Sequence, residues 1–570
     1  MNYLSIAKAL SIDKDVNPSE ELIKSAEFLG ISARDVIIKA RLVFVFLLFS
    51  LTFALFFLTR NLVSVAFSLG ISFLVYYYLT ENPKKKAYSE RLKALNYAPE
   101  IVTVFGTSIE LGRNLEDAVR LAADYCGGRI SDDLANAYKD SILLGKPLIR
   151  SFTNLIREWG EFSDGFKKSM RLMLAGLRES DPEKTIELGM STFLKSLSTD
   201  LKNFLGGIKT HTLILFSFGT IMPLIIISMM PVFNLLTLST SPLQVGGLLL
   251  VNLFLLWAYS RYILNKRPPS FSQIAVSPGK GNVFLSILIF FTVSSLSLIH
   301  YLAPLIGAYF PLPSYYASIP LVAAFPVSLS AYFYLNSHSL LKKRNEALKA
   351  EKELLGITYS LGVSLQEKRS FEDALKQEAL KEGIIPLHLR KALGAIKDLK
   401  VSPEKAIMEE LSFVDSDRVK SVFGLIFQAL RQGVSKGASG VFKVYEHFSQ
   451  MIQVEDENKA SLEQVLSMMK LTVVVFAPLI SAFIVMMQQM INVNVSSAAL
   501  TFVNLKGSIT IDLMELLLGY YMAGLVIILT SYNVYLKNGP DKVFLYNELS
   551  VNLLLSLAIY IGTLLLAKAF

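Results

Sequence analysis

Two glycine-lysine pairs are the closest that the chain comes to a nucleotide-binding motif. They are Gly145-Lys146 and Gly279-Lys280, and both lack the upstream glycine of the Gly-x-x-x-x-Gly-Lys-Ser/Thr pattern. That pattern is needed because its backbone N–H groups must close around a phosphate. We therefore expect no intrinsic ATP hydrolysis.

The histidines, one serine motif and the cysteine give no better support for an enzyme. The five histidines form no His-Glu-x-x-His motif and no close pair, as zinc catalysis would require. Gly437-Ala438-Ser439-Gly440 matches a rhomboid-type serine pattern, but it lies in a predicted cytoplasmic loop, so we expect a flexible turn after Gly433. Cys126 is the single cysteine, which excludes an intramolecular disulfide. The sequence predicts no enzyme, no metal site and no cofactor.

The composition indicates an integral membrane protein with large soluble parts. Of 570 residues, 52% are apolar and 18% are charged, and the mean hydropathy is +0.46; a soluble domain carries about 25% charged residues. A helix needs about 20 apolar residues to cross the hydrocarbon core. Nine runs qualify: 42–58, 62–79, 213–236, 243–264, 283–303, 315–335, 471–491, 514–536 and 549–566.

Basic residues predict the orientation of these runs, because lysine and arginine collect in cytoplasmic loops. With the N-terminus inside, only Arg60, Lys506 and Lys568 lie outside. We expect a multi-pass protein of the cytoplasmic membrane with its N-terminus inside and its C-terminus outside. The net charge of +9 then reflects topology, and we expect no nucleic-acid partner.

The polar segments between the runs complete the predicted organisation. Both long ones show apolar residues at i, i+3 and i+4 and almost no strand alternation, so the expected fold class is all-α. The expected order is an N-terminal cytoplasmic helical segment (1–41), a transmembrane hairpin (42–79), a cytoplasmic domain (80–212), four transmembrane helices (213–335), a second cytoplasmic domain (336–470) and three transmembrane helices (471–570).

The two cytoplasmic segments repeat each other. A shift of 256 residues aligns the 25 residues from Ile101 with those from Ile357, and eight positions are identical, including Gly106/Gly362. Pro223-Leu224-Ile225 matches Pro478-Leu479-Ile480 at a shift of 255. The sequence thus predicts a parallel tandem repeat of a helical domain followed by spans, whereas many transporters use inverted repeats.

A shared Arg-x-x-Glu-Asp pattern opens a helix in each copy. Asn114 and Ser370 are good N-caps, and the acidic residues that follow suit the positive end of the helix dipole. Capping explains the acids without a partner, and binding of a partner stays open as the other interpretation. Capping does not explain Arg113 and Arg369, which either pair locally or face a partner.

These features resemble the type II secretion system F domain family. The resemblance rests on Ser-x-x-x-x-Arg-x-x-Glu-Asp-Ala and on the Pro-Leu-Ile span, and it covers roughly residues 90–232 and 351–491. The fused layout looks most like the archaeal platform proteins of archaella or type IV pili. The resemblance implies a homodimeric membrane platform that docks a hexameric secretion ATPase and couples it to insertion of pilin-like or archaellin subunits, with rotation in an archaellum.

The resemblance also suggests residues for docking the ATPase, with two basic clusters among them. For those clusters, anchoring at the lipid surface is the alternative. The candidates are Lys84, Lys85, Lys86, Arg113, Glu116, Asp117, Lys342, Lys343, Arg344, Arg369, Glu372 and Asp373.

Three questions stay open at this level. Archaellum and pilus are not distinguished, and Asn494 begins a glycosylation sequon in the longest predicted outer loop. The alternative function is a polytopic secondary transporter or exporter. It is disfavoured because ionisable residues lie only near the span ends, where they can reach the head groups.

Overall fold

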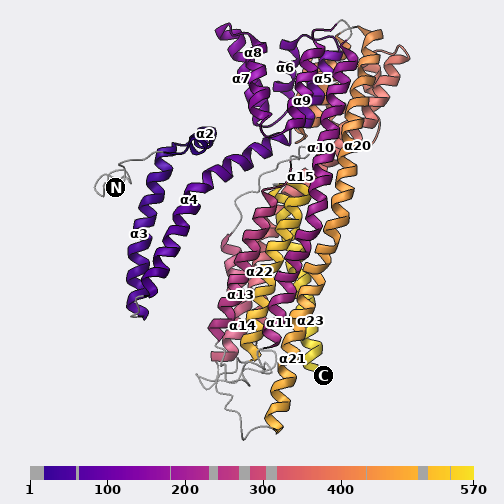
Figure 1. Ribbon diagram of the computed structural model, residues 1–570. Coiled ribbons are helices and arrows are strands. Elements are labelled where there is room, and N and C mark those ends of the chain that lie inside the picture. Colours follow the sequence, from indigo (N-terminus) through magenta and orange to yellow (C-terminus); the bar gives the residue numbers. More distant parts are fainter. Residues whose placement is uncertain are drawn as a thin grey trace. The chain divides into compact units, whose positions relative to one another are not determined.

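A computed structural model describes residues 18–59, 63–179, 182–229, 242–268, 283–302, 318–431, 433–498, 511–539 and 541–569. Within these residues every regular element is a helix, so the fold is all-α. The chain divides into two compact units, residues 1–95 and 96–570. Figure 1 labels most of the helices of both.

The first unit is a helical hairpin with a short helix before it. It contains α2 (Glu20–Phe28), α3 (Ala33–Thr59) and α4 (Val63–Leu95). The guanidinium of Arg91 lies 4.4 Å from the ring centre of Phe28, which attaches α2 to α4. The two long helices hold the first two predicted spans, but most side chains of those spans lie outside the described residues.

The second unit begins with six helices that continue into long apolar ones. They are α5 (Ala98–Glu110), α6 (Leu115–Tyr125), α7 (Arg129–Leu144), α8 (Leu148–Trp159), α9 (Asp164–Gly176) and α10 (Glu183–Phe216). After α10 the helix continues as η1 (Ser217–Ile221) and α11 (Met222–Ser228), and α13 (Pro242–Leu264) and α14 (Val283–Leu302) follow.

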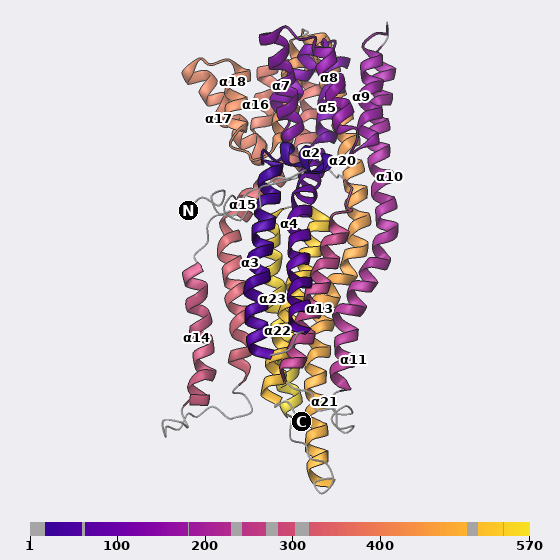
Figure 2. The same cartoon turned by 60° about the vertical axis from the view of Figure 1, so that its left-hand side comes forward.

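The same order returns in the rest of the unit. The elements are α15 (Ile319–Gln366), α16 (Phe371–Ala379), α17 (Ile384–Leu399), α18 (Pro403–Leu411), α19 (Asp417–Leu430), α20 (Val434–Leu471), η4 (Thr472–Phe476) and α21 (Ala477–Ala498). Two last helices, α22 (Ile511–Asn538) and α23 (Lys542–Ala569), complete the chain. In Figure 2 the short helices of both segments lie at the same end of the unit.

Residues with a positive φ recur at equivalent helix ends of the two segments. The first helix of each segment ends in a residue of positive φ, Gly112 (+73°) and Lys368 (+61°), and the third does so at Gly145 (+63°) and Lys400 (+52°). This left-handed position closes a helix by letting the next N–H groups reach carbonyls of the last turn. The first segment uses glycine there and the second uses lysine.

Each segment also has a π-helical turn at its entry into the apolar bundle. η1 ends two residues before Pro223, and η4 ends two residues before Pro478. Proline has no N–H to donate and its ring crowds the preceding turn, and a wider turn accommodates both defects. The π-turns thus explain how the helix tolerates the proline of each Pro-Leu-Ile.

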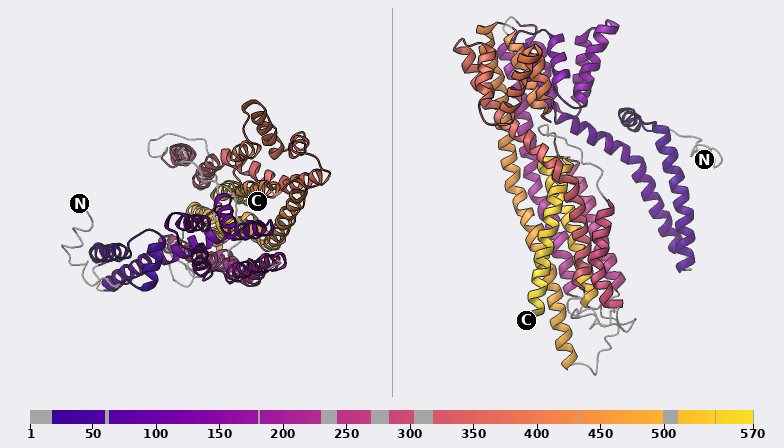
Figure 3. Two further views of the ribbon diagram at one scale, coloured as in Figure 1. Left: turned by 90° about the horizontal axis from the view of Figure 1, so that it is seen from above. Right: turned by 180° about the vertical axis from the view of Figure 1, so that it is seen from behind.

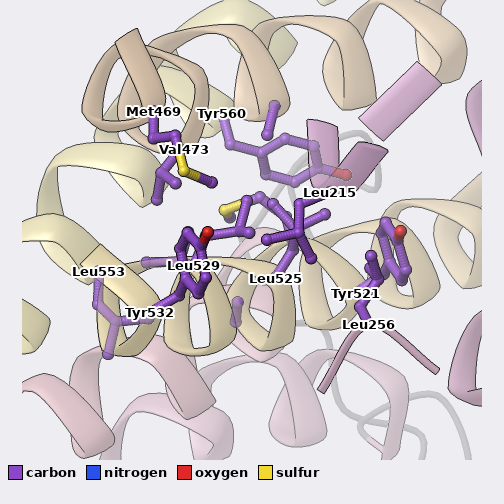
Figure 4. Packing of buried hydrophobic residues seen from close by; sticks show 14 of the residues in the cluster. Leu215, Leu256, Met469, Val473, Tyr521, Leu525, Leu529, Tyr532, Leu553 and Tyr560 are labelled. Carbon is purple, nitrogen blue, oxygen red and sulfur yellow. The ribbon is translucent and has the colours of Figure 1, made fainter. Parts of the chain in front are cut away.

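Seven helices among the described residues are long and apolar enough to cross a membrane. They overlap the predicted spans from the third to the ninth, and Figure 3 shows the orange helix α20 and the yellow α23 running along this bundle. Its core surrounds α22: Figure 4 shows Tyr521, Leu525, Leu529 and Tyr532 of α22 among side chains of α10, α13, α20, η4 and α23. Those side chains are Leu215, Leu256, Met469, Val473, Leu553 and Tyr560.

Candidate functional site

The first basic cluster lies on α4. The Lys84 ammonium is 2.9 Å from a carboxylate oxygen of Glu81 and 3.6 Å from one of Glu21, whereas Lys86 is exposed. The Lys85 side chain lies outside the described residues. Lys84 is therefore engaged in its own unit, and Lys86 is available to a partner.

The second basic cluster lies on α15 and is also divided. Lys342 and Lys343 are exposed. The Nε of Arg344 is 2.5 Å from Asp541 Oδ2, and its guanidinium lies 4.9 Å from the centre of the Phe544 ring. Arg344 thus ties α15 to the start of α23, which is a structural role.

The two motif arginines differ in their surroundings. Arg113 is half-buried, and its Nη2 donates to the backbone carbonyl of Gln428 at 3.3 Å. Arg369 is 43% exposed and pairs locally with Glu367 at 2.9 Å. Arg369 therefore takes one of the two options left open by the sequence, local pairing, whereas Arg113 takes neither, because it contacts the other helical segment of the same chain.

The acidic residues of the motif sit where capping predicts. The Asn114 side chain accepts from the N–H of Asp117 at 2.9 Å, and the Ser370 hydroxyl accepts from the N–H of Asp373 at 3.1 Å. Glu116 and Glu372 are exposed in the same first turns. N-capping is confirmed at both helices, and the two exposed glutamates stay candidates for contact with a partner.

A buried polar region joins the two helical segments. Helix α5 is buried along almost its whole length, against α9 and α10 of its own segment and α19 and α20 of the other. The carboxyl of Glu100 is 1% exposed and lies 3.2 Å from the Ser421 hydroxyl, which is also 3.0 Å from the backbone carbonyl of Tyr125. Burial raises the pKa of Glu100 to about 7, against a partial lowering by Arg418.

A buried ionic network continues from this contact. Arg418 is 5% exposed, and its two terminal nitrogens lie 3.1 Å from Glu351 and 2.8 Å from Glu455. Lys459 approaches the other oxygen of Glu455 at 2.5 Å. Burial by itself would lower the pKa of Arg418, but the carboxylates of Glu455 and Glu351 raise it instead. The network joins α15, α19 and α20 and keeps the guanidinium charged.

Two further polar contacts cross between the segments. His447 Nε2 lies 2.7 Å from a carboxylate oxygen of Glu110, and both side chains are buried. Lys443 pairs with Glu183 at 2.6 Å nearer the surface. Together with Glu100 and Ser421, these pairs fix one helical segment to the other by polar contacts as well as packing.

Sequence reasoning missed this contact. Glu100 and Arg418 each lie in a helix of otherwise largely apolar residues, APEIVTVFGTSIE and DRVKSVFGLIFQAL. A charged side chain among apolar ones is expensive to bury unless it is paired. That pattern was the available signal, although it does not identify the partner.

Other expectations from the sequence are corrected or stay open. Gly437-Ala438-Ser439-Gly440 is part of α20 and is not a turn, since the helix begins directly after Gly433. The predicted outer loop after residue 491 begins later, because α21 continues to Ala498; the side chain of Asn494 lies outside the described residues. The Cys126 thiol is buried, which raises its pKa and makes it a poor nucleophile.

The arrangement supplies no recognisable catalytic centre among the residues described. No group of three or more His, Cys, Asp or Glu side chains there could hold a metal ion. What it offers is a rigid contact between two helical segments that continue into an apolar bundle. No protein-family model, curated protein or solved structure matches the chain.

Proposed function

We propose that this protein is a membrane platform for assembly of an archaellum or type IV pilus. In this proposal it docks a hexameric secretion ATPase on its helical segments and couples the ATPase to insertion of pilin-like or archaellin subunits. The motif resemblance supports the family, and the shared helix order, left-handed helix ends and π-turns support a tandem repeat of one domain.

One observation carries the mechanical part of the proposal. Helices α10 and α20 lie, with their π-turns, in the continuous candidate spans Glu183–Ile221 and Lys436–Met487, and α15 joins a candidate span to the second segment in 48 residues without a break. At 1.5 Å per residue α15 is about 72 Å long. A displacement of the helical segments by a partner would thus reach the bundle through continuous helices.

The proposed topology extends the seven candidate spans to nine by adding the α3–α4 hairpin. The N-terminus and both helical segments are then cytoplasmic, and the C-terminus is outside. Seven of the docking candidates have side chains that reach solvent: Lys86, Glu116, Lys342, Lys343, Arg369, Glu372 and Asp373. Arg344 and Arg113 are excluded from that role by their contacts within the second unit.

Binding of the ATPase tests the proposal directly. The full chain in detergent should bind the cognate hexameric secretion ATPase, and the double variant Lys342→Glu/Lys343→Glu should weaken binding at least tenfold. The control Lys391→Glu/Lys397→Glu makes the same charge change at exposed positions of α17. Equal affinity of both variants would remove the α15 cluster from the docking surface.

A cellular experiment tests the function as a whole. Cells without the gene should lack one type of surface filament by electron microscopy, and the wild-type gene should restore it. Normal filaments of every type in the deletion strain would overturn the platform function.

A further inference from the structure

A cavity of about 270 Å³ lies between α20, α22 and α23. None of its lining residues is a docking candidate, although Arg344 lies 4.9 Å from the ring centre of Phe544 in its wall. Apolar side chains of Leu466, Val534 and Phe544 form part of its wall, and the remaining lining is polar or charged. A mixed cavity of this kind binds a ligand that has both apolar and polar parts.

The charges of the cavity are balanced. Lys470 lies 3.2 Å from Glu548, and Lys537 pairs with Glu463. The lysine side chains are 57% and 34% exposed, so each ammonium has further N–H donors directed away from its glutamate. Two positive and two negative groups favour a ligand that carries both signs over a purely anionic one.

The deeper lining presents unused hydrogen-bond acceptors. Asn552 is 4% exposed, and its amide nitrogen donates to Thr530 Oγ1 at 3.2 Å. The amide oxygens of Asn552 and Asn533 are buried and accept no hydrogen bond from any residue that the structure describes. A buried acceptor without a donor costs free energy, so a ligand with N–H or O–H donors gains by entering.

The cavity opens at the level where lipid head groups are expected. Lys470 and Lys537 each lie one residue beyond a predicted span, and Glu548 lies one residue before another. On the proposed topology these residues mark the inner surface of the membrane, where head groups lie. The cavity therefore extends from head-group level into the apolar bundle.

We propose that this cavity binds a phosphate ester that carries a primary ammonium group, supplied by a phospholipid head group. The phosphate contacts Lys470 and Lys537, and the ammonium donates to the amide oxygens of Asn533 and Asn552. The lipid source rests on the proposed membrane topology, whereas the phosphate-ammonium chemistry rests on the side chains alone.

The test uses the full chain, purified in detergent, stripped of lipid and studied by native mass spectrometry. The probes are phosphatidylethanolamine, phosphatidylcholine, phosphatidylglycerol and soluble phosphoethanolamine. Phosphatidylethanolamine should bind at least tenfold more tightly than phosphatidylcholine, whose trimethylated nitrogen has no N–H donor. Soluble phosphoethanolamine should displace phosphatidylethanolamine only weakly. If it displaces the lipid when both are at the same concentration, the site is supported and its natural ligand is a soluble phosphate ester.

Variants locate the site. Asn552→Leu should remove the preference for phosphatidylethanolamine, whereas Asn552→Asp keeps an acceptor and should retain it even if Leu disturbs folding. Asn252→Leu is the matched control, because the Asn252 amide oxygen also accepts no bond from the described residues but lies on α13. Equal binding of phosphatidylethanolamine and phosphatidylcholine, tighter binding of phosphatidylglycerol, or an unchanged preference in Asn552→Leu would overturn the proposal.

Failure of the lipid-binding proposal can be distinguished from failure of the platform function. Alkaline extraction of the membranes from which the chain is purified reports whether the chain is embedded in the bilayer. The ATPase-binding assay reports docking. If the chain prefers phosphatidylethanolamine but does not bind the ATPase, only the platform function is contradicted. If it binds the ATPase but shows no lipid preference, only the proposal for the cavity is contradicted.

Discussion

The two helical segments share an order of helices but differ at the position where α9 and α19 begin. Ser163 and Ser416 cap these helices in the same way, each accepting from the N–H three residues later at 3.3 Å. Two residues after the cap the first segment has Gly165, close to Ser196, and the second has the buried Arg418. The backbone plan is thus common to both segments, and the buried charge belongs only to the second.

A shared glycine shows what the segments have in common. A Cβ on Gly106 would lie 2.6 Å from the Met190 sulfur on α10, and one on Gly362 would lie 3.2 Å from the Phe442 ring on α20. Both glycines let the first helix of a segment approach its long helix closely. The identical residue at this alignment position therefore has the same packing reason in each segment.

The largest expected effect comes from removing the charge that is found only in the second segment. Arg418→Met leaves Glu351 and Glu455 without their buried guanidinium, and breaking such a network costs about 3–5 kcal/mol. Thermal unfolding in detergent should show a large fall in the midpoint. Arg369→Met, at an exposed pair, should change stability by less than about 1 kcal/mol. Similar losses for both variants would contradict the difference in burial.

The second prediction concerns pH at the contact between the segments. Because the pKa of Glu100 is raised to about 7 from 4.5, the folded protein holds this proton more tightly than the unfolded chain. Its contribution to stability is present below pH 4.5 and is lost as the pH rises through 7, by up to about 3 kcal/mol. Glu100→Gln should therefore stabilise the protein at pH 8 and have little effect at pH 4. A pH profile unchanged by the substitution would refute this.

The third prediction tests the packing between the segments. A Cβ on Gly424 would lie 2.5 Å from the Tyr125 ring, so Gly424→Ala should cost about 1–3 kcal/mol through overpacking. Gly394→Ala on α17 has no atom within 4 Å of its Cβ and should stabilise the helix by up to about 1 kcal/mol. Chemical denaturation of the two variants measures the difference, and equal shifts would show that Gly424 has room.

The smallest expected effect tests the helix ends. Lys368→Gly relieves the positive φ of a lysine and should stabilise the second segment by about 0.5–1 kcal/mol, while Gly112→Lys should destabilise the first by a similar amount. Opposite shifts of the unfolding midpoint are expected. Shifts of the same sign would indicate that the two helix ends are not equivalent.

Local features of the fold followed from the sequence. The helical character, the caps at Asn114 and Ser370 and seven apolar runs depend on residues near each other in the chain, and the structure confirms them. The turn predicted at Ser439 was wrong, because α20 begins directly after Gly433 and includes Ser439. The glycines near Ser439 remain helical, and one of them, Gly440, packs closely against Ala429 and Leu111.

The sequence by itself determined an all-helical chain with apolar runs of spanning length, a repeated motif and a charge distribution that favours one orientation. Only the tertiary structure decided that Arg113 is held by the other segment, that Arg344 is a structural tie and that Glu100 is buried beside Ser421. Glu100 and Ser421 are 321 residues apart. Helix formation depends on neighbours within a few positions, whereas burial and pairing of a charge depend on which distant helices pack against it.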